Sequence, residues 1–172
     1  AGVVLGQKPV DLTVPNGIEV GFNHRTVSRY RSPLSGAWRN GDNLEQMLIN
    51  AINSAEKEIL VAVQELSLPR IAESLVAASR LGVNVKVILE NNYSTPWSQD
   101  HELALSGHGR QRLQRLRAQA DQDRNGVVSS EEARKHDALL ILQNGQIPWI
   151  DDTEDGSKGS GLMHHKFVVI DG

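Results

Sequence analysis

The feature that most constrains the fold is a strand–helix–strand pattern in the first half of the chain. Glu58–Leu66 is apolar enough to form a strand buried on both faces. Ser67 is the expected N-cap of the next helix, which carries Pro69 in its first turn and ends at Gly82. Val83–Leu89 then alternates apolar and other residues, as a strand does. Two strands joined by a helix form a βαβ unit, so we predict an α/β fold with a mixed, partly parallel sheet flanked by helices.

Further elements surround this unit. Helical periodicity begins at Leu44 and runs to Ala55, which favours an amphipathic helix. The remaining expected elements are a strand at Ile18–Phe22, a short helix at 136–143 that stops at Gly145, a strand near 147–150, a loop at 151–161 and a strand at Leu162–Ile170.

Composition excludes several classes of protein. The 172 residues suit one domain with a core of ordinary size. The absence of cysteine excludes a disulfide framework and a thiolate zinc site. A formal charge of −3 excludes a surface that is cationic throughout. No apolar run approaches the length of about 18 residues that a transmembrane helix needs, so no transmembrane segment is predicted.

The pattern changes between residues 95 and 135. This stretch is polar, rich in arginine and helical by propensity, and the alternation of helix and strand resumes only after it. We therefore predict a helical insertion at 95–135 within an otherwise compact domain that spans 1–172.

The last predicted strand carries the residues that point most strongly to chemistry. His164, Lys166 and Asp171 follow the spacing His-x-Lys-x4-Asp. Side chains two residues apart on a strand project from the same face, so His164 and Lys166 are expected side by side. Asp171 has the opposite parity and lies at the strand end, where the chain can turn it back. A neutral imidazole is a nucleophile and an ammonium neutralises phosphoryl oxygens, so the pair suits attack on phosphorus through a phosphohistidine. The alternative to this catalytic interpretation is that the histidine and the lysine lie at a strand end by chance.

This motif, followed by Gly172, resembles the signature of the phospholipase D superfamily, and the order of the upstream elements resembles that of its single-motif bacterial endonucleases. The resemblance implies that His164 is the nucleophile, or the acid in a paired motif, that Lys166 binds phosphate, and that Asp171 supports them. It also implies two motif copies around one phosphate, supplied by a dimer partner or by a missing C-terminal half. Catalysis would need no metal.

The chain departs from the family pattern in two places. It ends at Gly172 without the Gly-Ser-x-Asn segment that usually follows the motif, so we expect 1–172 to be C-terminally incomplete. Gln64-Glu65 replaces an aromatic often found near the end of the second strand.

The insertion contains a second motif, Asp121-Gln-Asp-Arg-Asn-Gly-Val-Val-Ser-Ser-Glu-Glu132, which matches the EF-hand calcium loop at every specified position. Helical sequence flanks it at Arg110–Ala120 and Ser130–Leu140. The expected ligands are Asp121, Asp123, Asn125, the Val127 carbonyl, Ser129 directly or through water, and Glu132 with both oxygens. The alternative is a polar helix–turn–helix with a chance turn. We expect the loop to bind a structural calcium ion. Because weak single sites fill in millimolar calcium, a periplasmic or secreted location is favoured over a cytoplasmic one.

Four arginines lie between Glu19 and Asp42 without an intervening acidic residue, and Tyr30 and Trp38 are interleaved with them. These candidate substrate-binding residues are Arg25, Arg29, Arg31 and Arg39. Arginine with aromatic residues suits a phosphate backbone with stacked bases. A second arginine cluster at 110–117 is equally well interpreted as a solvated helix face.

The leading hypothesis is therefore a phosphodiesterase that acts on nucleic acid. One alternative is a phospholipase D that acts on phospholipid headgroups, although an aromatic content of 4% argues against an extensive membrane-binding rim. The other is a calcium-binding interaction module with a vestigial site.

Overall fold

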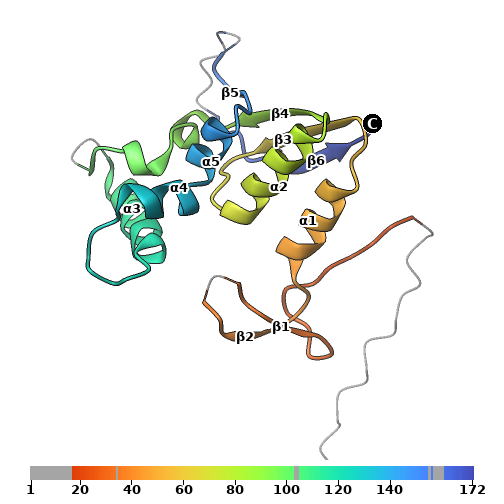
Figure 1. Ribbon diagram of the computed structural model, residues 1–172, viewed down its shortest axis with the longest axis horizontal. Helices are drawn as coiled ribbons and strands as arrows, with labels where there is room; N and C mark the ends of the chain where they lie inside the picture. The colour runs from red at the N-terminus through yellow and green to blue at the C-terminus, as the bar shows by residue number, and fades with distance from the viewer. Residues whose placement is uncertain (1–16, 34, 103–104, 155, 157–160) are drawn as a thin grey trace, which may run out of the picture. The chain divides into compact units, whose positions relative to one another are not determined.

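The computed structural model describes residues 17–33, 35–102, 105–154, 156 and 161–172, and every structural statement below refers to these residues (Figure 1). The chain divides into two compact units, Ala1–Leu44 and Glu45–Gly172. Each unit is described by itself.

The first unit contains a small antiparallel hairpin of β1 (Arg29–Arg31) and β2 (Trp38–Asn40). The prediction of a strand at Ile18–Phe22 is wrong, since this segment has no strand conformation. Its apolar side chains are exposed, and no strand in the described part of the chain pairs with it. Instead, Phe22 exchanges hydrogen bonds with Asp42: the Phe22 N–H donates to the Asp42 carboxylate, and the Asp42 N–H donates to the Phe22 carbonyl.

The second unit is built on a four-stranded sheet in the order β5-β4-β3-β6. Its strands are β3 (Glu58–Val63), β4 (Asn84–Leu89), β5 (Trp149–Asp151) and β6 (Lys166–Ile170). The pairs β3–β4 and β4–β5 are parallel, whereas β6 runs antiparallel to β3. The predicted fold class, a mixed and partly parallel sheet flanked by helices, is confirmed.

Three helices cover one face of this sheet: α1 (Leu44–Asn53), α2 (Pro69–Arg80) and α5 (Ala138–Asn144). Their apolar side chains and alternate residues of β3 and β4 form the main core. On the other face, Ile88, Ile150 and Phe167 are exposed. The prediction that β3 is buried on both faces is therefore wrong: one set of its side chains is buried, and the other set is only partly covered.

A short 3-10 turn, η1 (Asn91–Tyr93), precedes the predicted insertion at 95–135, which contains a second 3-10 turn, η2 (Trp97–Gln99), α3 (Gly107–Ala120) and α4 (Ser130–His136) up to its last residue. It has its own small core of Trp97, Leu113, Leu116 and Ala120. A single helix at Ser130–Leu140 does not form, because Asp137 interrupts it. The fully buried carboxylate of Asp137 accepts hydrogen bonds from the N–H groups of Leu139 and Leu140, and so caps α5.

Several predicted boundaries shift. The helix α2 is preceded by Leu68 without a side-chain cap, so the expected Ser67 N-cap is not used, although Pro69 does begin the helix. The strand β3 ends at Val63, and β6 begins at Lys166 rather than Leu162. Among the described helices, none is both long and apolar enough to cross a membrane.

Candidate functional site

The first candidate site lies where the parallel strands end. Because β6 runs antiparallel to β3, its first residue meets the last residue of β3, with Lys166 opposite Val63. One residue further, the Gln64 N–H donates to the His165 carbonyl at 2.9 Å. His164 and Lys166 are therefore held at the carboxyl end of the sheet, the edge where α/β folds place their ligands, and both are exposed.

The Lys166 ammonium has two acceptors at this edge. It donates to the backbone carbonyl of His164 at 3.0 Å and to Oε1 of Gln64 at 3.2 Å. An ammonium carries three N–H donors, so one remains for a ligand. The structure thus brings the His164 backbone carbonyl and the Lys166 ammonium together, and among the described residues the ammonium has one N–H donor without an acceptor.

Asp171 lies at the other end of β6. Five residues of extended chain, about 16 Å, separate it from Lys166. Its carboxylate accepts the backbone N–H groups of Glu56, Lys57 and Glu58 at 2.7–2.9 Å. These bonds lower the pKa of the Asp171 carboxyl, and the bond from the Glu56 N–H contributes most. The expected turn back toward the histidine does not occur, and Asp171 instead fastens the end of β6 to the start of β3.

Acidic residues follow the parallel strands at the same edge, and sequence reasoning did not single them out. Glu90, only 2% exposed, accepts hydrogen bonds from the backbone and side-chain amides of Asn92. Asp152 accepts from the Asn91 N–H. Hydrogen bonds from Thr153 lower the pKa of Asp151. The available signal was positional, because Glu90 and Asp151 directly follow the strands predicted at 83–89 and near 147–150, and Asp152 comes one residue later.

A buried guanidinium connects the insertion to this edge. Arg112 of α3 is 9% exposed, and its Nε donates to Oε1 of Glu65 at 2.8 Å. Its Nη1 lies 3.6 Å from Asp100, and the group lies 5.1 Å from the centre of the Tyr93 ring. Burial raises the pKa of Asp100, and the charge of Arg112 opposes that shift. The interpretation of 110–117 as a solvated face therefore fails for Arg112.

The calcium-loop motif forms a compact turn between α3 and α4. One carboxylate oxygen from each of Asp121, Asp123 and Glu132 lies within 4.8 Å of the other two. Oxygens that share one calcium ion at about 2.4 Å are at most about 4.8 Å apart, so the three carboxylates fit a single ion. Gly126 has φ of 84°, the left-handed conformation that the sharp turn at this loop position requires.

The same side chains organise the loop through hydrogen bonds. Asp121 accepts from the N–H groups of Asn125 and Gly126, and Asn125 Oδ1 accepts from Val127. Glu132 and Ser129 form a capping box that begins α4. Hydrogen bonds from Ser129, and then from Gln122, lower the pKa of Glu132 to about 2, so this carboxylate is charged at any pH near neutrality.

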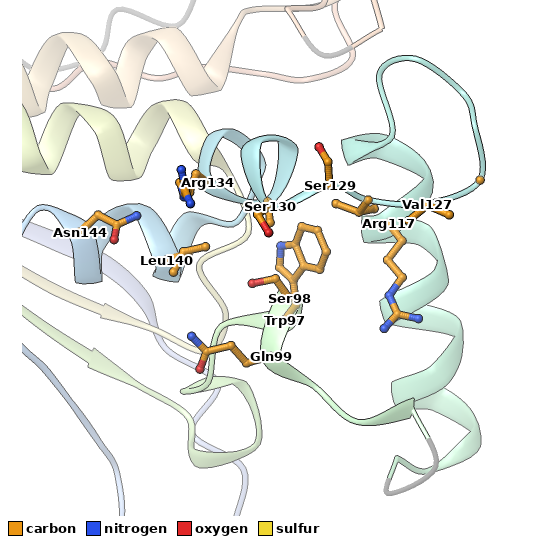
Figure 2. A pocket seen from close by; sticks show the side chains of 13 residues that line it. Trp97, Ser98, Gln99, Arg117, Val127, Ser129, Ser130, Arg134, Leu140 and Asn144 are labelled. Atoms are coloured by element: carbon orange, nitrogen blue, oxygen red, sulfur yellow. The ribbon is translucent and has the colours of Figure 1, made fainter.

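A cavity of about 560 Å³ lies between the insertion and α5 (Figure 2). It is lined by the loop segment 126–130 and by side chains of η2, α3, α4 and α5, including Trp97, Arg117 and Arg134. The Trp97 indole is 3% exposed, and its N–H has no hydrogen-bond partner within the described part of the chain. None of the lining residues belongs to the edge that holds His164 and Lys166, so this cavity is separate from that edge.

The four candidate arginines lie in the first unit, where they differ in their partners. Arg25 lies over the Phe22 ring and 3.6 Å from Asp42. Arg31 donates from Nε to the Gly36 carbonyl. Arg29 lies 4.5 Å from the centre of the Trp38 ring, which is 62% exposed, and Arg39 lies on the exposed strand β2.

The mixed sheet has a histidine and a lysine at its carboxyl edge, as expected from the resemblance of the motif to phospholipase D-like proteins. The sequence comparisons agree: residues 48–172 match the family described as cardiolipin synthase, PLD-like domain, and the chain belongs to this family. No curated protein matches the chain.

One similar solved structure is the crystal structure of a phospholipase D family member, Nuc from Salmonella typhimurium. It shares 20% sequence identity with the chain, and its TM-score is 0.42. The match covers 74% of this chain and 57% of that one, so the chain spans little more than half the length of this relative.

Proposed function

We propose that this protein is a phosphodiesterase that hydrolyses nucleic acid through a phosphohistidine intermediate. The observation that carries the proposal is the placement of His164 and Lys166 at the carboxyl edge of the sheet in a chain of the PLD-like family. A second copy of the motif, from a dimer partner or from further chain, completes the site.

Each residue has a distinct role. A ring nitrogen of His164 forms a bond to phosphorus while the bond from phosphorus to the leaving oxygen breaks, and the second motif's histidine protonates that oxygen. Water then attacks phosphorus, gives a proton to the same histidine and releases His164. Lys166 neutralises the phosphoryl oxygens in both steps. Asp171 acts at a distance, by fixing the strand that carries the other two.

The choice of nucleic acid as the substrate is supported by the hairpin of the first unit. Its exposed Trp38 offers a ring on which a base can stack, and Arg29 and Arg39 offer charge for phosphates. Arg25 and Arg31, which already have acceptors, contribute less.

The test is cleavage of short single- and double-stranded DNA by the native polypeptide with EDTA present. His164→Ala and Lys166→Ala are each expected to reduce cleavage by at least about a thousandfold. His165→Ala is the matched control, because His165 packs against Phe167 and should leave activity near that of the parent. Full activity in His164→Ala would refute the proposal, and turnover of phosphatidylcholine vesicles without DNA cleavage would favour the lipid alternative.

We further propose that the loop at 121–132 binds one structural calcium ion. Asp121, Asp123 and Glu132 supply carboxylates, and Asn125, the Val127 carbonyl and Ser129 complete the set. The ion would stabilise the junction of α3 and α4, and millimolar calcium outside the cytoplasm would fill the site, in keeping with a periplasmic or secreted location.

A further inference from the structure

Gln64 occupies a junction between three strands. Its backbone N–H donates to His165, just before β6, at 2.9 Å, and its carbonyl accepts from the N–H of Glu90, just after β4, at 3.3 Å. The Gln64 side chain therefore starts from a backbone position that neighbours fix on both sides.

That side chain meets the Lys166 ammonium. Oε1 of Gln64 accepts from Nζ at 3.2 Å, while the His164 carbonyl accepts from the same nitrogen at 3.0 Å. Two acceptors from different segments restrict the direction of the ammonium far more than one does, because a lysine side chain alone has four flexible bonds.

Both acceptors are neutral, although carboxylates are close by in the sequence. Glu65 is bonded to Arg112, and Glu90 is bonded to Asn92. Within the described residues, Lys166 forms no salt bridge. The ammonium is thus oriented without having its charge cancelled, which is what binding of an anionic phosphoryl group requires.

We propose that Gln64 is a positioning residue: it aims the Lys166 ammonium at the substrate phosphate and leaves its positive charge free. This proposal rests on the phosphate-binding role of Lys166 in the proposed function. It adds a residue outside the His-x-Lys-x4-Asp motif to the site.

The first test observes the ammonium directly, without a substrate. Solvent exchange of the Lys166 ammonium protons is measured by NMR, with the signal assigned from Lys166→Arg. Gln64→Met keeps the length of the side chain and removes the acceptor, so exchange should become faster, whereas Gln64→Glu should keep it slow. Gln114→Met, at an exposed position of α3, is the control and should change nothing. Unchanged exchange in a folded Gln64→Met protein would overturn the proposal.

The second test measures affinity for inorganic phosphate by calorimetry. Gln64→Met should weaken binding by about three- to tenfold, the value of one ordinary hydrogen bond. Gln64→Glu should also weaken binding, since its carboxylate competes with phosphate. If Lys166→Met weakens binding and Gln64→Met does not, the positioning role is refuted while the proposed function stands. If Lys166→Met binds phosphate normally, the phosphate role of Lys166 fails instead.

Discussion

Arg112 and Glu65 join α3 to the end of β3 through a 2.8 Å hydrogen bond between partly buried charges 47 residues apart in the sequence. This bond is a direct link between the insertion and the edge that holds Lys166. Because Glu65 follows Gln64 in the chain, any movement of α3 at Arg112 acts on the residue next to the one that contacts the ammonium.

Arg112→Ala is expected to destabilise the fold by about 3 kcal/mol, because it leaves Glu65 and Asp100 partly buried without their cation. Arg115→Ala, on an exposed position of the same helix, is the matched control and should change stability by less than about 0.5 kcal/mol. Urea unfolding measures both. Equal effects of the two substitutions would contradict the structural role of Arg112.

Gly145→Ala tests the packing of α5 on α2. A Cβ at this position would overlap both methyl groups of Val76, so the substitution should cost about 2 kcal/mol. Gly107→Ala, where a Cβ meets nothing within 4 Å, should be close to neutral. Adding Val76→Ala to Gly145→Ala should remove the clash. If the stability changes of the two single variants simply add in the double variant, this contact is disproved.

Asp171 is expected to make stability depend on acid. Its folded-state pKa is lowered, chiefly by the Glu56 N–H, so its contribution is present above the unfolded value of about 3.9 and is lost as pH falls through the lower folded value. Asp171→Asn should therefore lower the melting temperature at pH 7 and flatten its fall below about pH 4. Glu73→Gln, on the exposed face of α2, is the control. If Asp171→Asn lowers the melting temperature by the same amount at every pH, the charge of Asp171 is not the cause.

Calcium binding has a separate test. Titration calorimetry of the native chain should show one site, and Asp121→Ala should abolish it by removing a ligand that also holds the N–H groups of Asn125 and Gly126. Because the pKa of Glu132 is about 2, binding should persist down to about pH 5. Asp152→Asn removes a carboxylate outside the loop, so this control variant should bind calcium as the parent protein does. Absence of heat at millimolar calcium would refute the calcium proposal.

The sequence was sufficient for those parts of the fold that local patterns encode. The βαβ unit follows from the strand periodicity around Val85 and the helical periodicity of α2, and the two strands do pair in parallel. The strand that begins at Lys166 follows from its periodicity, but His164 precedes that strand, so the same-face alignment predicted from their spacing of two does not apply to it. The segment at Ile18–Phe22 has the right alternation but no partner strand among the described residues, and a strand needs a partner for its backbone hydrogen bonds.

The rest depends on long-range contacts that no local pattern contains. The antiparallel direction of β6 puts Asp171 against Glu56 rather than near the histidine, because an extended strand carries the two motif ends apart. The burial of Arg112 depends on Glu65 and Asp100, which are distant in the sequence. The contact of Gln64 with Lys166 joins residues 102 positions apart.

The strand β3 pairs with two partners that lie at very different distances along the chain, and this difference has a consequence for folding. Glu58 and Asn84, opposite each other on β3 and β4, are 26 residues apart, whereas Glu56 and Asp171 are 115 apart. Closing the longer loop costs more entropy, so we expect the parallel strands to assemble before β6 joins them. Lys166 enters the sheet with β6. The edge that holds Lys166 is therefore expected to form late in folding, after most of the scaffold exists.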